Sequence, residues 1–281
     1  MKKNFQLLLL SLFISSISMG QGLKLPSPSP TQTIKQEFAL SEVSITYSRP
    51  SAKGRVIFGD LVKYDTIWRT GANSSTKITF GDDVKINGKG VPAGQYALFT
   101  RPGKSEWEII LSKNLETWGS MGYKPDADFM RFKVKSSSIP EHVETFTILF
   151  SNVKPASMDI QLVWEKTAVS FTISAEIDSE IMANIEEAMK GEKKPYFQAA
   201  AYYYETNRDL PKALEWVNEA VKGEPKAYWV EHLKAKIQYK LQDFKGAIAS
   251  AESSKGKAKE QGNPDYVALN EKLIAEAKKA K

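Results

Sequence analysis

The sequence predicts two folded parts: an antiparallel β-sandwich-like domain over residues 34–174 and an all-α, helical-repeat-like domain over residues 178–281. Three observations lead to this division. Short stretches that alternate apolar and polar residues follow one another from Glu42 to Ser174, which is typical of antiparallel strands. Apolar residues then recur at helical spacing from Ile177 onward. Within the helical part, two segments resemble each other at a fixed offset.

Residues 1–20 are typical of a secretory signal peptide. Lys2 and Lys3 precede an apolar run over residues 5–17, and small residues precede a cleavage point after Gly20. The run is shorter than the ~20 residues that span a bilayer, which favours cleavage over the alternative, an uncleaved membrane anchor. We therefore expect export to the periplasm or outer envelope of a Gram-negative-type bacterium, or secretion, with no membrane span after cleavage.

The segment that follows predicts an extended arm. Residues 21–33 are rich in proline and serine, which favour extended backbone and lead into the first strand. The chain contains no cysteine, and this excludes disulfides, a thiol nucleophile and thiolate metal sites. An exported protein without disulfides depends on a sizeable hydrophobic core.

Nine strands are expected in the first domain. Short strands, hairpin turns and the lack of intervening helices favour an antiparallel sandwich or barrel. Asn87-Gly88 predicts a type I′ hairpin turn, because both residues tolerate positive φ. The expected strands cover residues 42–48, 76–80, 83–86, 95–101, 105–112, 129–136, 142–153, 157–166 and 168–174.

One helix is expected to begin the second domain and another to end it. Residues 177–190 place apolar side chains at helical spacing, with Asp178 or Ser179 as the N-cap and Gly191 as the stop. Residues 265–280 form an amphipathic pattern that could cap a helical stack, because a terminal repeat cannot bury its face unaided.

An internal repeat lies between these two helices. Residues 208–220 align with residues 242–254 at an offset of 34 residues, which is the period of tetratricopeptide repeats. The alternative is a plain bundle of helical hairpins with accidental self-similarity, because the second copy is degenerate. The aligned pairs are Asp209 with Asp243, Leu210 with Phe244 and Ala213 with Ala247.

Charge and motifs exclude several function classes. The net charge of +6 comes from interleaved lysines and acids rather than a basic run, so no nucleic-acid partner is expected. His142 is expected at a strand edge and His232 on a helix surface, in different domains and without zinc spacing. Asp82-Asp83 and residues 126–128 lack the calcium-loop pattern and are interpreted as solvated turns. Without phosphate-loop, dinucleotide or nucleophile-elbow motifs, we expect no metal and no cofactor, and nothing indicates an oligomeric state.

Arginines and aromatic residues are dense between Tyr47 and Asn73, in the segment YSRPSAKGRVIFGDLVKYDTIWRTGAN. An arginine carries a planar fork of donors that can bind a carboxylate, a phosphate or backbone carbonyls, and aromatic rings can pack on a sugar or a guanidinium. Residues 115–128 form a second loop that could fold over the same end of the domain. The candidate ligand-binding residues are Arg49, Arg55, Tyr64, Trp68, Arg69, Asn73, Trp118 and Tyr123.

Two interpretations of this segment remain open. In the structural one, the arginines bond backbone carbonyls and Asp60 or Asp65, and Trp68 packs in the core. In the functional one, Arg49, Arg69 and Asn73 converge on a cleft that is lined by the three aromatic residues Trp68, Trp118 and Tyr123. Replacing Arg69 by alanine should cost about 2–4 kcal/mol of stability in the first case and little in the second.

The ordered motifs SRP, GRVIFG, WRTGAN, AGQYALF and WEIILSKN, followed by WEKTAVSFTI, resemble the family of bacterial secreted proteins numbered 2911 among domains of unknown function (DUF2911). The resemblance covers about residues 30–174. It implies a secreted β-rich domain, often followed by a helical or tetratricopeptide-like tail, and no activity that can be transferred. This chain has Lys63-Tyr64-Asp65 where many members have Pro-Tyr-Gly.

These observations favour a non-catalytic role in the cell envelope, in which the chain binds a protein, a peptide or a glycan. The alternative is an envelope hydrolase that acts on a carbohydrate or ester through carboxylates near Trp68–Asn73. Such an enzyme should show two carboxyl groups ~5–10 Å apart across one cleft beside Arg69. In a third case the first domain is a scaffold and only the helices bind.

Overall fold

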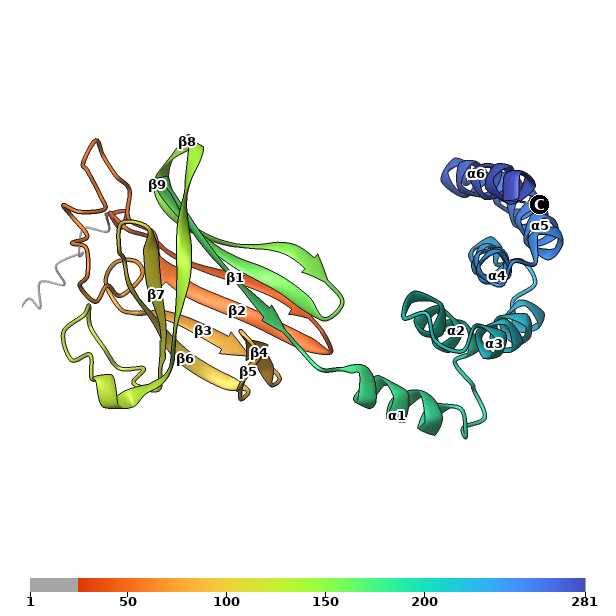
Figure 1. Ribbon diagram of the computed structural model, residues 1–281, viewed down its shortest axis with the longest axis horizontal. Helices are drawn as coiled ribbons and strands as arrows, with labels where there is room; N and C mark the ends of the chain where they lie inside the picture. Colours follow the sequence, from red (N-terminus) through yellow and green to blue (C-terminus); the bar gives the residue numbers. More distant parts are fainter. Residues whose placement is uncertain (1–24, 281) are drawn as a thin grey trace, which may run out of the picture. The chain divides into compact units, whose positions relative to one another are not determined.

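The computed structural model describes residues 25–280 (Figure 1). The expected signal peptide, residues 1–20, lies outside these described residues. The chain divides between Ala175 and Glu176 into two compact units, called here the β unit and the helical unit. A nine-stranded antiparallel sheet precedes six α-helices in the described part of the chain, which confirms the predicted fold class. None of these helices is long and apolar enough to cross a bilayer.

The nine strands form one sheet that folds over on itself. The sheet has the order β1-β2-β3-β6-β7-β8-β9-β4-β5. The long strand β8 pairs with β7 through residues 128–135 and with β9 from Ser136 onward. Side chains from both halves of the sheet therefore meet in one core, as in a sandwich. The strands are β1 (Thr31–Phe38), β2 (Ser41–Ser48), β3 (Thr76–Phe80), β4 (Val84–Ile86), β5 (Lys89–Val91), β6 (Gly94–Arg101), β7 (Glu106–Ser112), β8 (Asp128–Lys154) and β9 (Ser157–Ser174).

Strands β8 and β9 are each continuous, whereas the sequence pattern predicts two strands in each. In β8 the register shifts between Ser138 and Val143, so Pro140, which has no N–H to donate, falls in an irregular stretch. In β9, Glu165 adopts a positive φ of 50°. These irregularities bend the strands without ending them. The Asn87-Gly88 turn is found as predicted, with φ of 50° and 77° between β4 and β5.

An aromatic cluster around Trp68 lies in the core of the β unit. The Trp68 indole stacks on Trp164 with ring centroids 5.9 Å apart, and it meets Phe146 edge-on at 5.0 Å. Its Nε1 donates to the Gly71 carbonyl at 3.0 Å, so the one polar atom of the ring is satisfied. Because Trp68 belongs to the loop between β2 and β3, this cluster fixes the loop on the sheet.

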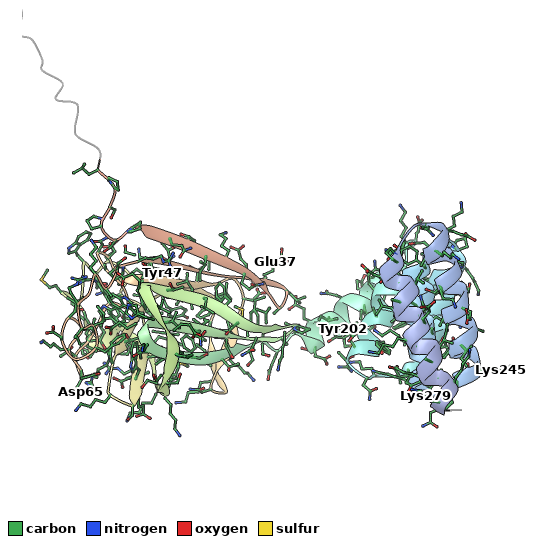
Figure 2. The ribbon with its side chains drawn as sticks, turned by 90° about the horizontal axis from the view of Figure 1, so that it is seen from above. Glu37, Tyr47, Asp65, Tyr202, Lys245 and Lys279 are labelled. Atoms are coloured by element: carbon green, nitrogen blue, oxygen red, sulfur yellow. The ribbon has the colours of Figure 1, made fainter. Side chains whose placement is uncertain are left out.

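Two loops that are distant in sequence meet at one end of the β unit. They are residues 49–75 and residues 113–127 (Figure 1). The Gly119 N–H donates to the Asn73 carbonyl at 3.0 Å, one of several bonds between the two loops. Asp65 marks this end in Figure 2, and Glu37 of β1 lies at the opposite end of the unit.

The helical unit begins with α1 and continues with five helices that pack on their neighbours. Asp209 and Asp243, the aligned residues of the repeat, both act as N-caps and accept bonds of 2.9 Å from Lys212 N and Gly246 N. This equivalence agrees with the alignment, and the tetratricopeptide assignment itself stays a prediction. The helices are α1 (Asp178–Ala188), α2 (Tyr196–Glu205), α3 (Leu210–Gly223), α4 (Tyr228–Lys240), α5 (Phe244–Glu260) and α6 (Pro264–Ala280).

The start of α1 differs from the prediction. Ile177 is the N-cap position, and no side chain caps the helix, so neither Asp178 nor Ser179 has that role. The Asp178 carboxylate instead accepts a bond of 2.6 Å from the Tyr202 hydroxyl and pairs with Arg208. These two partners come from the α2–α3 hairpin, and they hold the side chain away from the free N–H groups of α1.

His232 is half-buried in α4 rather than exposed on a helix surface. Its Nδ1 donates to Asn270 Oδ1 at 2.8 Å, and the fully buried Asn270 donates to Ser254 Oγ at 2.8 Å. This chain of bonds joins α4, α6 and α5. Burial lowers the pKa of the His232 imidazole below its ordinary value of 6.5, and the positive charge of Lys236 acts in the same direction.

We predict that the helical unit loses stability as the pH falls below 6.5. The unfolded chain takes up a proton on His232 near its ordinary pKa of 6.5, whereas the folded chain does so only at lower pH. Proton uptake below pH 6.5 therefore favours the unfolded state. The stabilisation that the neutral His232 provides is complete above the unfolded pKa and declines as the pH falls. Urea unfolding, followed by helical circular dichroism at about pH 7.5 and about pH 5.5, measures this effect. The His232→Asn variant should show a smaller decline, and an equal decline would contradict the assignment.

Candidate functional site

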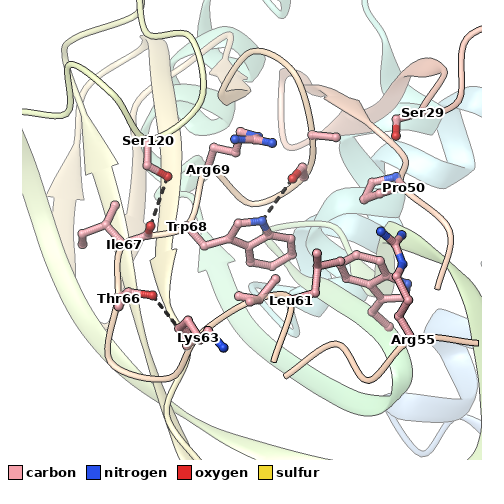
Figure 3. A pocket seen from close by; sticks show the side chains of 14 residues that line it. Ser29, Pro50, Arg55, Leu61, Lys63, Thr66, Ile67, Trp68, Arg69 and Ser120 are labelled. Carbon is pink, nitrogen blue, oxygen red and sulfur yellow. Dashed lines mark hydrogen bonds between the residues drawn. The ribbon is translucent and has the colours of Figure 1, made fainter. Parts of the chain in front are cut away.

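A cavity of about 400 Å³ lies at the loop end of the β unit (Figure 3). The core indoles of Trp68 and Trp164 form part of its wall, and the two loops form the rest. We call it the Arg69 cavity. Its lining residues are Ser29, Pro50, Arg55, Leu61, Val62, Lys63, Thr66, Ile67, Trp68, Arg69, Gly71, Ala72, Ser120 and Trp164.

A tight turn after Trp68 positions Arg69. Thr70, Gly71 and Asn73 all have positive φ, at 57°, 150° and 58°. Gly71 is required, because a Cβ at this position would lie 2.8 Å from the Ser48 carbonyl. Thr70 is β-branched, so its left-handed backbone is strained by about 1–3 kcal/mol, and its fully buried hydroxyl bonds Thr100 Oγ1 at 3.1 Å. The segment Thr-Gly-Ala-Asn thus holds an unfavourable conformation beside the cavity.

The Arg69 guanidinium has no hydrogen bond or ion pair from the residues that the structure describes. Its Nε is buried without a partner. Gly119 lies close to it, because a Cβ at that position would be 2.9 Å from Arg69 Nη1. Burial lowers the pKa of Arg69, but a guanidinium remains charged at neutral pH. Arg69 therefore presents a charged group whose Nη donors bind no described residue.

The other two cations of the cavity have partners. Arg55 donates from Nε to the Ala52 carbonyl at 2.9 Å and from Nη2 to the Ser51 carbonyl at 2.8 Å. The exposed Lys63 lies 3.5 Å from Asp60. Within residues 25–280, no carboxylate lines the cavity, so its electrostatic character is positive.

Arg49 and Asn73 were expected beside Arg69 but support the fold nearby instead. Arg49 bonds the Phe146 carbonyl at 3.2 Å and Thr147 Oγ1 at 2.8 Å, which joins the loop to β8. Asn73 donates to Ser48 Oγ at 3.3 Å. Neither residue lines the Arg69 cavity, so the predicted convergence of these three residues is not found. The arrangement of Arg49 matches the structural interpretation of this segment.

The remaining aromatic candidates also lie outside the cavity. Tyr64 packs over Gly59, and Trp118 is 67% exposed at the tip of the second loop. Tyr123 donates to Asp128 at 2.6 Å and accepts from Arg131 at 2.7 Å. Burial, followed by the bond to Asp128, raises the pKa of the Tyr123 hydroxyl. Of the eight candidates, the structure brings together Arg55, Trp68 and Arg69.

Several lining residues escaped prediction because they lie far apart in the chain. Lys63 and Thr66 belong to the same loop as Arg69, whereas Ser120 comes from the second loop and Trp164 from β9. The Ser120 hydroxyl donates to the Ile67 carbonyl at 3.0 Å, which sets the position of the second loop. In the sequence, only the Trp-Gly motif at residues 118–119, which directly precedes Ser120, indicated that the second loop reaches this end of the domain.

Acidic side chains in the described region do not gather as a metal site. No group of three His, Asp or Glu residues there has the proximity that a metal ion needs. Asp83 accepts a bond from Ala93 N at 2.8 Å, and Asp128 pairs with Arg131 at 2.6 Å. Both carboxylates therefore have local partners.

Comparison with known proteins gives a family and no activity. No curated protein and no solved structure matches the chain significantly. The family model described as "Protein of unknown function (DUF2911)" matches residues 29–173. Since this match spans more than half of the 281 residues and includes the whole Arg69 cavity, the chain belongs to the DUF2911 family of proteins of unknown function.

Proposed function

We propose that this chain is an exported, non-catalytic binding module of the cell envelope, and that the Arg69 cavity receives an anionic group of its ligand. The observation that carries the proposal is the buried Arg69 Nε without a partner. A buried donor without an acceptor costs about 1–3 kcal/mol, and a charged group costs more. An anion from a peptide, protein or glycan would supply the missing acceptor. The signal-like pattern of residues 1–20 supports export.

Backbone strain beside Arg69 also favours a functional role. Thr70 and Gly71 are held in rare conformations by the core and by their hydrogen bonds. Such strain often marks a binding site, where positioning a side chain matters more than local stability. In this case the positioned side chain is Arg69.

The Arg69 cavity lacks the pair of carboxyl groups that a glycosidase would need. Glycosidases use two carboxyl groups ~5–10 Å apart. No described Asp or Glu lines the Arg69 cavity. We therefore do not propose that the cavity is the active site of a carbohydrate or ester hydrolase.

We assign a second binding surface to the helical unit, on the premise that α2–α6 form a tetratricopeptide-like stack. The matching caps Asp209 and Asp243 and the fully buried Ala213 and Ala247 support this premise. Stacked helical repeats bind proteins and peptides on an extended face. The partner in this case is a protein of the cell envelope.

We predict that Arg69→Met leaves the β unit as stable as before or stabilises it by about 1 kcal/mol, because it removes a half-buried guanidinium whose Nε is buried without a partner. Arg49→Met is the matched control. It removes two bonds to β8, at 3.2 and 2.8 Å, and should cost about 2 kcal/mol. Denaturant unfolding followed by tryptophan fluorescence measures both variants. A loss of about 2 kcal/mol in Arg69→Met would show that Arg69 supports the fold, and would refute its assignment to a ligand.

We predict that acetate binds at Arg69 in solution. Acetate replaces chloride at constant ionic strength while the Nε–H resonances of the arginines are followed by NMR. The Arg69 resonance should shift and saturate, whereas that of Arg49, which already donates to Phe146, should stay in place. An unshifted Arg69 resonance would count against an anion site.

A further inference from the structure

Arg69 is the one cation of the cavity that has no bonded partner among the described residues. Arg55 uses Nε and Nη2 on two carbonyls, and Lys63 shares Asp60. The Thr66 and Ser120 hydroxyls donate to the Lys63 and Ile67 carbonyls, at 2.8 and 3.0 Å (Figure 3). The cavity therefore offers one guanidinium, that of Arg69, whose donors bind no described residue. A guanidinium fork matches a carboxylate, which accepts two parallel bonds.

Part of the wall around this fork is apolar. Pro50, Leu61, Val62 and Ile67 line the cavity together with the Trp68 indole. A sugar acid would need further free donors and acceptors for its ring hydroxyls, because buried hydroxyl groups need partners. The Thr66 and Ser120 protons are already engaged and cannot serve a sugar, whereas the apolar part of the wall suits a hydrocarbon side chain. The volume of about 400 Å³ is within the range of small-ligand pockets.

Exposed apolar side chains surround the cavity. Leu61, which lines it, is 47% exposed. Trp118 and Met121 flank the Gly119-Ser120 pair that contacts Arg69 and Ile67, and they are 67% and 76% exposed. Large exposed apolar groups that gather around a pocket mark an interaction surface. A ligand that extends out of the cavity would therefore meet apolar side chains.

We propose that the Arg69 cavity binds the C-terminus of a peptide or protein whose last residue is apolar. Arg69 grips the terminal carboxylate, the apolar walls hold the last side chain, and Trp118 and Met121 contact the preceding residues. This inference rests on the proposed function and names its ligand class. It favours peptides over acidic glycans because of the apolar part of the wall and the exposed apolar side chains nearby.

Isothermal titration calorimetry on the whole chain without its signal segment tests the proposal with two matched peptides. The probes are acetyl-Ala-Ala-Leu with a free carboxylate and the same peptide as its amide. The acid should bind more than about tenfold more tightly than the amide, because a charge-assisted pair of bonds is lost in the amide. Arg69→Met should abolish this preference. Arg69→Lys, which keeps the charge and loses the fork, should bind the acid less tightly than the native protein.

Arg101→Met is the matched control, because this exposed arginine of β6 lies outside the cavity, and it should bind the acid normally. Equal binding of acid and amide would overturn the proposal, as would loss of binding in Arg101→Met. Digalacturonate is the competing probe. If digalacturonate binds through Arg69 and the peptide acid does not, the ligand is an acidic glycan. This outcome would refute the proposed C-terminal peptide ligand and leave the proposed function in place. If neither probe binds, the proposed C-terminal peptide ligand is also refuted. The acetate titration then tests whether Arg69 binds an anion at all.

Discussion

The burial of Trp68 is the constraint on which the candidate site depends. Its indole stacks on Trp164 from β9 and packs against Phe146 from β8, so it fixes a long loop to the sandwich. The next residue, Arg69, then has to lie beside that core, because the bond from the indole to Gly71 closes the chain into a tight turn. The position of Arg69 thus follows from how the protein buries its aromatic residues.

Arginines of the same loop contribute to the protein in different ways. Arg49 and Arg55 bond backbone carbonyls, and this satisfies acceptors that an irregular loop leaves without partners. Arg69 has no such bond among the described residues, although Gly119 leaves room for its guanidinium. A purely structural arginine would have found an acceptor. These three arginines carry the same donors. The bonded state of Arg49 and Arg55 indicates a supporting role, and the unbonded state of Arg69 is the basis for proposing a ligand-binding one.

The sequence predicted regular elements well and side-chain partners poorly. Alternation located most strands, and Asp209 and Asp243 cap their helices because capping depends on residues only a few positions away. The continuity of β8 depends on bending around Pro140, which no local pattern encodes. Likewise, the partner of Arg49 lies almost one hundred residues further along the chain, as does Trp164 from Arg69. Whether an arginine is bonded is decided by such distant contacts, so the sequence left both the structural and the functional interpretation open.

On the proposed function, the free guanidinium of Arg69 links the stability of the β unit to ligand binding. In the free protein, Arg69 contributes an unfavourable desolvation term, which the apolar core around Trp68 and Trp164 must offset. A ligand that supplies an acceptor removes this term and binds only the folded state, so it stabilises the fold by mass action. The partly buried setting also strengthens the attraction between the guanidinium and an anion relative to water. The same burial that makes Arg69 costly in the free protein would therefore favour the binding of an anionic group.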